Sequence, residues 1–411
     1  MSTMSVRAGV IAFVTVLASL ANAATALGDL PEHTQVAEFF DEDIIPDPSG
    51  SHLVDVGFGE GVAIRNDVAF IGVPRRGNGH VIVQNLTATG WKQVQRLTAP
   101  NSSAQGFGRV LTFRDGVLVV NGANAAYVFK RGGNGLFKFT QTLTPPAADG
   151  VSNFPVALRY EAGVLLASAF RRSAPSVVYV FERDATGVFV RRAKVKASDG
   201  TAGDSFGASI SMTSRLFVVG SPGDAAYTFR RNSSGNWVQA QKLVPAVPAP
   251  GFGTAVAIDR DMILVGAPAA DLEGGDRGTP TADFHIAGGA VFGFLPGVSG
   301  YIESFKLRPR PDERFEYEQF GSAIAMSGAR IAVTATGPLP QALLLPEGLV
   351  FTYTRNGSSV LARGIASDQG QVTAMGLSNN ALLIGAYSDT TTCRWLCERV
   401  VRIYDDNLFE P

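Results

Sequence analysis

A phenylalanine-glycine dipeptide recurs at a regular interval through the 411-residue chain. Five complete copies and two degenerate ones begin 49, 47, 52, 46, 68 and 52 residues apart. The copies are Phe58-Gly59, Phe107-Gly108, Phe154-Pro155, Phe206-Gly207, Phe252-Gly253, Phe320-Gly321 and Val372-Thr373. Self-similarity at such a period indicates that each repeat is one supersecondary unit and that stacked units share their core. The chain is therefore expected to contain seven similar units.

Each unit contains four strand signals and no clear amphipathic helix. In the unit that starts at Phe252, small residues at 253–258 lead through a tight turn to a second strand at 262–265, which ends in Gly266-Ala267-Pro268. Aromatic third strands, such as 177–181, precede fourth strands such as 237–243. Four antiparallel strands in each of seven units predict an all-β fold, a seven-bladed β-propeller of four-stranded antiparallel blades.

The seventh unit lacks a fourth strand, because the chain stops after the strand signal at 400–404. Residues 33–40, near the other end, have the pattern of a fourth strand and precede the first Phe-Gly pair. We expect this N-terminal strand to complete the last blade, which would remove an open sheet edge. Residues 24–411 then form a single propeller domain, with blades starting near 58, 107, 154, 206, 252, 320 and 372.

The first 23 residues resemble a secretory signal peptide. Arg7 precedes an apolar run at 8–21, and the small-residue pattern Ala21-Asn22-Ala23 follows. The run is too short to span a membrane comfortably, although an uncleaved anchor is the alternative. We expect export to the periplasm or the extracellular space, with no transmembrane span in the mature chain.

Charge composition argues against a nucleic-acid partner. Lys and Arg number 35 and Asp and Glu number 36, so the formal net charge is −1 and no basic excess is present to neutralise phosphates. No pattern in the sequence indicates a cofactor. We expect a monomer whose partner is a protein or a glycan.

The recurring Phe-Gly pair, together with Gly-Ala-Pro at the end of the second strand, resembles the FG-GAP repeat family, whose best known members form the propeller of integrin alpha subunits. The segment from Ala197-Ser198-Asp199-Gly200 to Phe206-Gly207 looks closest to a secreted bacterial branch of that family. The resemblance implies a propeller that serves interaction. Integrin-like members hold calcium in Asp-rich loops between the first two strands. Here those connections are short hairpin turns with too few oxygen ligands, so we carry over no metal site.

Three other patterns have a functional and a structural interpretation. Gly203-Asp204-Ser205-Phe206-Gly207 matches the Gly-x-Ser-x-Gly hydrolase motif, but the repeat and the strand that follows oppose that interpretation. Cys393 and Cys397 favour a structural disulfide in an oxidising compartment over a redox or metal role. The insertion in the fifth unit contains Asp271, Glu273 and Asp276, which form either one calcium-binding loop or a solvated excursion; we favour the latter.

Candidate ligand-binding residues lie in the long connections. In a propeller, the connections between second and third strands emerge on the same face as those between blades, and here both groups are long and varied. We expect this face to bind the ligand through a set of arginines and one tryptophan. The set is Arg75, Arg76, Arg171, Arg172, Arg310 and Trp395.

The leading hypothesis is an exported, non-catalytic binding propeller without catalytic residues. One alternative is a hydrolase or lyase acting at the mouth of the central pore, which would need converging carboxylates or a His with an acid. A passive envelope component is a third interpretation.

Overall fold

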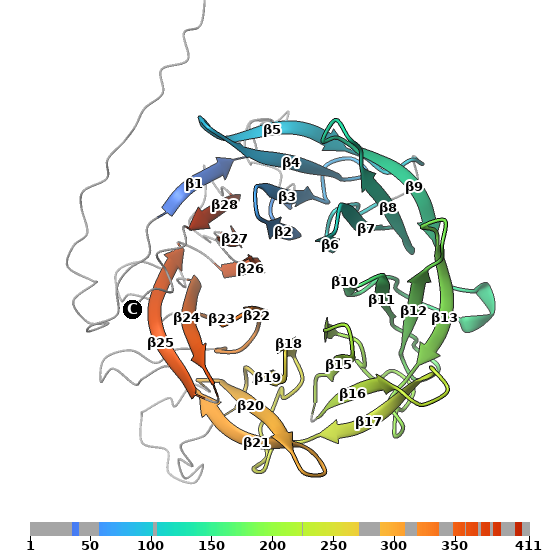
Figure 1. Cartoon of the computed structure of the whole chain (residues 1–411), viewed down its shortest axis with the longest axis vertical. Coiled ribbons are helices and arrows are strands. Elements are labelled where there is room, and N and C mark those ends of the chain that lie inside the picture. The colour runs from blue at the N-terminus through green and yellow to red at the C-terminus, as the bar shows by residue number, and fades with distance from the viewer. Residues whose placement is uncertain are drawn as a thin grey trace, which may run out of the picture.

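A computed structural model describes residues 35–40, 57–101, 105–223, 225–270, 288–308, 319–336, 348–357, 359–368, 371–378, 381–387 and 399–404. Within these residues the strands form seven antiparallel sheets of four strands each. The sheets surround a central axis as blades, and in blades 1 to 6 the innermost strand is the shortest (Figure 1). The predicted seven-bladed, all-β propeller is therefore confirmed.

The blades are numbered along the chain and their strands are given from the axis outward. Blade 1 consists of β2 (Val62–Arg65), β3 (Val68–Val73), β4 (His80–Thr87) and β5 (Gly90–Leu97). Blade 2 consists of β6 (Leu111–Arg114), β7 (Val117–Gly122), β8 (Ala125–Arg131) and β9 (Phe137–Leu143). Blade 3 consists of β10 (Leu158–Glu161), β11 (Val164–Ala169), β12 (Val177–Arg183) and β13 (Phe189–Val195). A 3₁₀ turn over Ala147–Asp149 precedes blade 3.

The remaining blades follow the same plan. Blade 4 consists of β14 (Ser209–Met212), β15 (Leu216–Ser221), β16 (Ala225–Arg231) and β17 (Trp237–Leu243). Blade 5 consists of β18 (Ala255–Asp259), β19 (Met262–Ala267), β20 (Ala290–Gly297) and β21 (Gly300–Leu307). Blade 6 consists of β22 (Ile324–Ser327), β23 (Arg330–Thr336), β24 (Gly348–Asn356) and β25 (Ser359–Asp368). Blade 7 consists of β26 (Gln371–Leu377), β27 (Leu382–Tyr387), β28 (Arg399–Tyr404) and β1 (Gln35–Phe40).

Blade 7 is completed by the N-terminal strand, as the sequence predicts. β1 pairs antiparallel with β28, and Phe39 lies opposite Val401. The Phe39 ring also meets the ring of Trp91 in blade 1 edge-on, with centroids 6.4 Å apart. The first strand therefore closes blade 7 and packs against blade 1, where the ring begins.

The Phe-Gly pairs lie where each inner strand begins. The six phenylalanines of these pairs are at most 1% exposed; they are Phe58, Phe107, Phe154, Phe206, Phe252 and Phe320. In five units the backbone N–H of the next residue, a glycine, donates to a carbonyl at the end of the second strand, as from Gly253 to Gly266 at 3.0 Å. The motif thus provides a core side chain and, beside it, a backbone hydrogen bond that holds the start of the blade.

The hydrophobic core lies between blades rather than within them. One cluster joins Val68 and Phe70 of blade 1 to Phe107 and Leu118 of blade 2. Second strands such as β3 and β19 are buried along their whole length, whereas β9 on the outside is mostly exposed between buried ends. This gradient is expected of sheets that are covered on both faces near the axis.

In three pairs of neighbouring blades, a glutamine on the outermost strand of one blade forms hydrogen bonds with the outermost strand of the next. The Gln141 amide accepts a hydrogen bond from the N–H of Phe189 and donates to its carbonyl, both at 2.8 Å. Gln95 makes the same pair of bonds with Phe137, and Gln241 with Tyr301. The side-chain amide therefore extends the hydrogen bonding of one sheet to the next.

No helix among the described residues is long and apolar enough to cross a membrane.

Candidate functional site

Two of the four described candidate arginines hold loops in place. Arg171, after β11, donates from Nε to the carbonyl of Asp149 at 2.7 Å and from Nη1 to the carbonyl of Pro175 at 3.3 Å. Arg75, after β3, forms an ion pair with Glu60 at 2.5 Å, and Arg109 also contacts Glu60 at 3.2 Å. These side chains join connections of neighbouring blades, a structural function that the sequence analysis did not anticipate.

Arg76 and Arg172 lie next to these two residues in the same connections. Arg172 is exposed, and Arg76 is half-buried. We call the face that carries these connections the loop face. The other candidates lie outside the described residues: Arg310, Trp395, Cys393, Cys397, Asp271, Glu273 and Asp276.

An aspartate braces the loop face in two consecutive blades. The Asp149 carboxylate accepts from the Tyr179 hydroxyl at 2.5 Å and from Lys194 Nζ at 2.7 Å. These bonds, chiefly that of Lys194, hold the pKa of the Asp149 carboxyl below its usual value. Burial, with the bond to Asp149 adding to it, raises the pKa of the Tyr179 hydroxyl.

The same arrangement recurs one blade later. Asp199 accepts from the Tyr227 hydroxyl at 2.9 Å and from Lys242 Nζ at 2.6 Å. The hydrogen bond from Lys242 is the main reason that the pKa of the Asp199 carboxyl is lowered. The sequence signal for both braces is an aspartate 30 or 28 residues before the tyrosine of an aromatic third strand.

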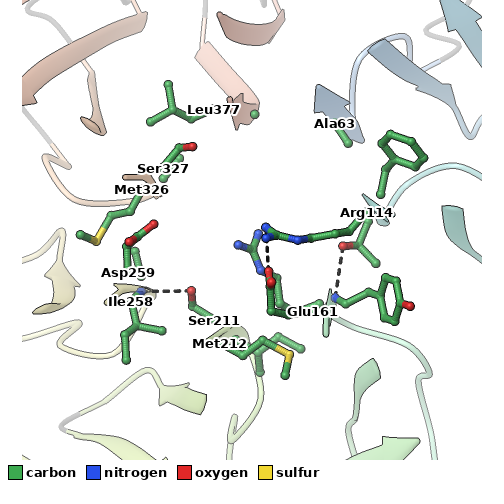
Figure 2. A pocket seen from close by; sticks show the side chains of 18 of the residues that line it. Ala63, Arg114, Glu161, Ser211, Met212, Ile258, Asp259, Met326, Ser327 and Leu377 are labelled. Carbon is green, nitrogen blue, oxygen red and sulfur yellow. Dashed lines mark hydrogen bonds and ion pairs between the residues drawn. The ribbon is translucent and has the colours of Figure 1, made fainter. Parts of the chain in front are cut away.

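A cavity of about 440 Å³ lies on the propeller axis, where the seven innermost strands line it. We call it the central channel. Its lining includes a polar residue at the end of five inner strands; these are Arg65, Arg114, Glu161, Asp259 and Ser327. Figure 2 shows the side chains of Arg114 and Glu161 reaching into this space, with Asp259 on the other side.

Hydrogen bonds between blades position several of the channel side chains. The Ser211 hydroxyl accepts from the N–H of Ile258 at 3.1 Å, and the Thr112 hydroxyl accepts from the N–H of Tyr160 at 3.3 Å (Figure 2). Asp259 Oδ2 accepts from the N–H of Gly328 at 2.9 Å. Each bond joins the inner strand of one blade to the blade that follows, so the channel wall is held by the ring itself.

Charges of both signs face the central channel. Arg114 Nη1 lies 2.8 Å from Glu161 Oε2. Burial raises the pKa of the Glu161 carboxyl, although Arg114 and Arg159 oppose that shift. Burial is also the main reason that the pKa of the Arg159 guanidinium is lowered, and the nearby charges of Arg114 and Arg65 add to the effect. The channel is therefore a confined, charged site.

Sequence analysis missed the central channel as a charged site. The connections that begin at Arg65, Arg114 and Glu161 were considered only as short hairpin turns, and Arg159 was not considered. The available signal is the polar residue that recurs just before the first turn of a unit. Its side chain can be assigned to the channel only when the strand register is known.

Metal and nucleophile motifs gain no support from the described part of the chain. There, no group of three or more His, Cys, Asp or Glu residues is arranged to hold a metal ion. Within Gly203-Asp204-Ser205-Phe206-Gly207, the Asp204 carboxylate accepts from the N–H groups of Ser176 and Thr201, at 2.8 and 3.1 Å. The motif joins two connections on the loop face, and strand β14 follows it rather than a helix.

The fold and the repeating Phe-Gly unit define this protein as a seven-bladed β-propeller. Two stretches of the chain match the family described as FG-GAP repeat, over residues 189–236 and 237–279. The first match begins at β13 of blade 3 and continues through three strands of blade 4. The matched repeat therefore begins with the outermost strand of one blade and continues into the inner strands of the next. The ring closure has the same order, because β1, the outermost strand of blade 7, precedes blade 1 in the chain.

Solved structures show the same fold at low sequence identity. The WD40 domain of coronin from Toxoplasma gondii matches with a TM-score of 0.53 and 8% identity, over 92% of this chain and 88% of that one. A protein from Lactobacillus plantarum matches with a TM-score of 0.51 and 13% identity, over 79% of this chain and 95% of that one. These likenesses concern the fold alone. No curated protein sequence matches the chain.

Proposed function

We propose that this protein is an exported, non-catalytic binding protein that recognises a protein or a glycan through its loop face. A propeller with FG-GAP repeats fits a binding or interaction role in general. The observation that carries the proposal is the bracing of the loops. Arg171 holds the carbonyl of Asp149, and Asp204 holds the N–H of Ser176, so connections of successive blades are fixed to each other before any ligand arrives. Preorganisation of this kind lowers the entropic cost of binding.

A glycan array and a pull-down with purified partners test this proposal. The variant Arg76→Ala/Arg172→Ala removes two loop-face cations without touching the Arg171 brace. We expect it to lose most of the captured ligand while it still melts cooperatively. Arg192→Ala, which removes an exposed arginine from the outermost strand β13, is the matched control. Equal capture by the double variant and the wild type would contradict the loop-face proposal.

Export is the second part of the proposal. The apolar run at 8–21 and the Ala21-Asn22-Ala23 pattern support it. N-terminal sequencing of protein recovered outside the cytoplasm should begin at Ala24. Recovery of the full-length chain in the cytoplasm alone would refute export. A monomer is expected on size-exclusion chromatography.

A propeller enzyme is the second candidate, and one observation favours it. Glu161 lies in the central channel with its pKa raised by burial, and Asp259 lines the same cavity. A carboxyl with a raised pKa suits general acid catalysis. Turnover of glycosides, esters or polyuronates by the purified protein, lost in Glu161→Gln, would favour the enzyme over the binding protein.

A further inference from the structure

The central channel contains two arginines, Arg65 and Arg159, whose side chains form no hydrogen bond or ion pair with a described residue. The charges of Glu161 and Asp259 favour the charged form of Arg159 only from a distance. Nε of Arg159 is buried without a hydrogen-bond partner, and so is Nε of Arg114. A buried cationic donor without an acceptor is costly, and a bound anion would remove that cost.

Arg65 and Arg159 line the same cavity. Arg65 and Arg114 both disfavour the charged form of Arg159, which places the three guanidinium groups, from blades 1, 2 and 3, within reach of each other's fields. Arg114 is already paired with Glu161 at 2.8 Å. Arg65 and Arg159 therefore supply the positive charge on one side of the channel, and the exposed Arg260 lines it at blade 5.

Apart from the exposed Arg260 in blade 5, the rest of the channel offers hydrogen-bonding groups. Asp259 Oδ2 is occupied by the N–H of Gly328, which leaves Oδ1 to accept from a ligand. The hydroxyls of Thr112 and Ser211 each accept a backbone N–H and retain a proton to donate. The carboxylates of Asp259 and Glu161 would repel a compact multivalent anion. A ligand with one negative charge and several hydroxyl groups fits this set of partners.

We propose that the central channel binds an acidic sugar, with its carboxylate held by Arg65 and Arg159 and its hydroxyl groups facing Asp259 and the Ser211 hydroxyl. Arginine pairs bidentately with carboxylates, which fixes the orientation of the ligand. The cavity of about 440 Å³ falls within the range of about 300–1,000 Å³ for small-molecule sites. The site uses residues on the propeller axis, so it stands apart from the proposed loop-face function.

Isothermal titration calorimetry at low ionic strength tests the assignment, with D-glucuronate as the probe and D-glucose and inorganic phosphate as comparisons. We expect heat from glucuronate and none from glucose. Arg159→Gln should weaken glucuronate binding about tenfold or more, as expected for loss of one charge-assisted hydrogen bond. Arg192→Gln, in the same blade but on its outermost strand, should bind as the wild type does.

Three results would overturn the proposal: no heat from glucuronate with a cooperatively melting wild type, equal binding of glucose, or phosphate binding without glucuronate binding. Circular dichroism establishes that each variant is folded. If Arg159→Gln is misfolded, Arg65→Gln replaces it with the same expected loss, and unchanged affinity in a folded variant rejects the site. Loop-face variants should leave glucuronate binding intact, so failure of one proposal can be told from failure of the other.

Discussion

Gly385 of blade 7 approaches the carbonyl oxygen of Gly59 in blade 1 so closely that a Cβ atom at position 385 would lie 2.2 Å from it. The same relationship joins Gly220 to Gly253 at 2.1 Å and Gly266 to Gly321 at 2.0 Å. In each case a second-strand glycine meets the glycine of the next Phe-Gly pair. The glycine of the Phe-Gly pair and the glycine of the second strand therefore form the two sides of one contact between blades.

This contact predicts a large effect for Gly266→Ala. The added methyl group has no space against a backbone carbonyl, so the blades must separate, and we expect a loss of about 3 kcal/mol or more in the free energy of unfolding. Gly133→Ala is the matched control, because a Cβ there meets nothing within 4 Å. Chemical denaturation measures both. Similar stability of the two variants would refute the close-contact interpretation.

Removal of the closing strand should destabilise the whole ring. Deletion of residues 24–40 from the mature chain removes the outer partner of β28, which stays paired with β27, and uncovers Trp91. We expect a sharply lower melting temperature or insoluble protein, measured by differential scanning calorimetry and sedimentation. The mature chain, residues 24–411, serves as the control. A propeller that melts normally without β1 would argue against closure by this strand.

The glutamine bridges between outermost strands should contribute measurably to stability. Gln141→Ala removes two hydrogen bonds to the backbone of Phe189 and leaves a half-buried N–H and carbonyl unsatisfied. We expect a loss of about 1–3 kcal/mol in the free energy of unfolding. The exposed Gln93 supplies the control, and Gln93→Ala should be neutral. If both variants unfold at the same denaturant concentration, the bridge contributes nothing.

The aspartate braces make stability depend on pH in the acid range. Since hydrogen bonds from Lys194 and Tyr179 lower the folded-state pKa of Asp149, its stabilising contribution is complete above the unfolded-state value of 3.8. It is lost as the pH falls through the lower folded-state pKa. Asp149→Asn should therefore be less stable than the wild type at neutral pH, with the difference shrinking in acid. Thermal melts from about pH 2 to pH 7 measure this difference.

The exposed turn residue Asp67 provides the comparison for the pH experiment. Asp67→Asn should follow the wild-type melting curve across the range. A gap between Asp149→Asn and the wild type that stays constant down to pH 2 would show that the ionised carboxylate is not what stabilises the loop.

The fold could be predicted because its determinants are local and repeated. The Phe-Gly pairs of five units occupy equivalent places in their blades, and the degenerate copies Phe154-Pro155 and Val372-Thr373 complete the spacing that gives the number of blades. Closure could be predicted from the missing fourth strand of blade 7 and the unassigned strand pattern at 33–40. Each of these features is visible without knowing any contact between distant residues.

The loop face and the central channel were harder to predict than the fold, because side-chain partners depend on tertiary contacts. Arg171 is a typical binding residue by type and position, yet its Nε donates to the carbonyl of Asp149, a backbone group that no sequence pattern marks. Arg159 is the opposite case, because it lines the central channel although its type and position in the sequence do not mark it as a binding residue. It looks like an ordinary polar residue in a strand, and only the register of β10 and the ring of inner strands place it in the central channel.

The pairing of β1 with β28 has a consequence for biosynthesis. β1 is synthesised before β28, so blades 1 to 6 can form while the ring is still open. A chain truncated before β28 would leave β1 unpaired and expose the seam between blades 7 and 1. Closure of the ring therefore cannot precede the synthesis of β28.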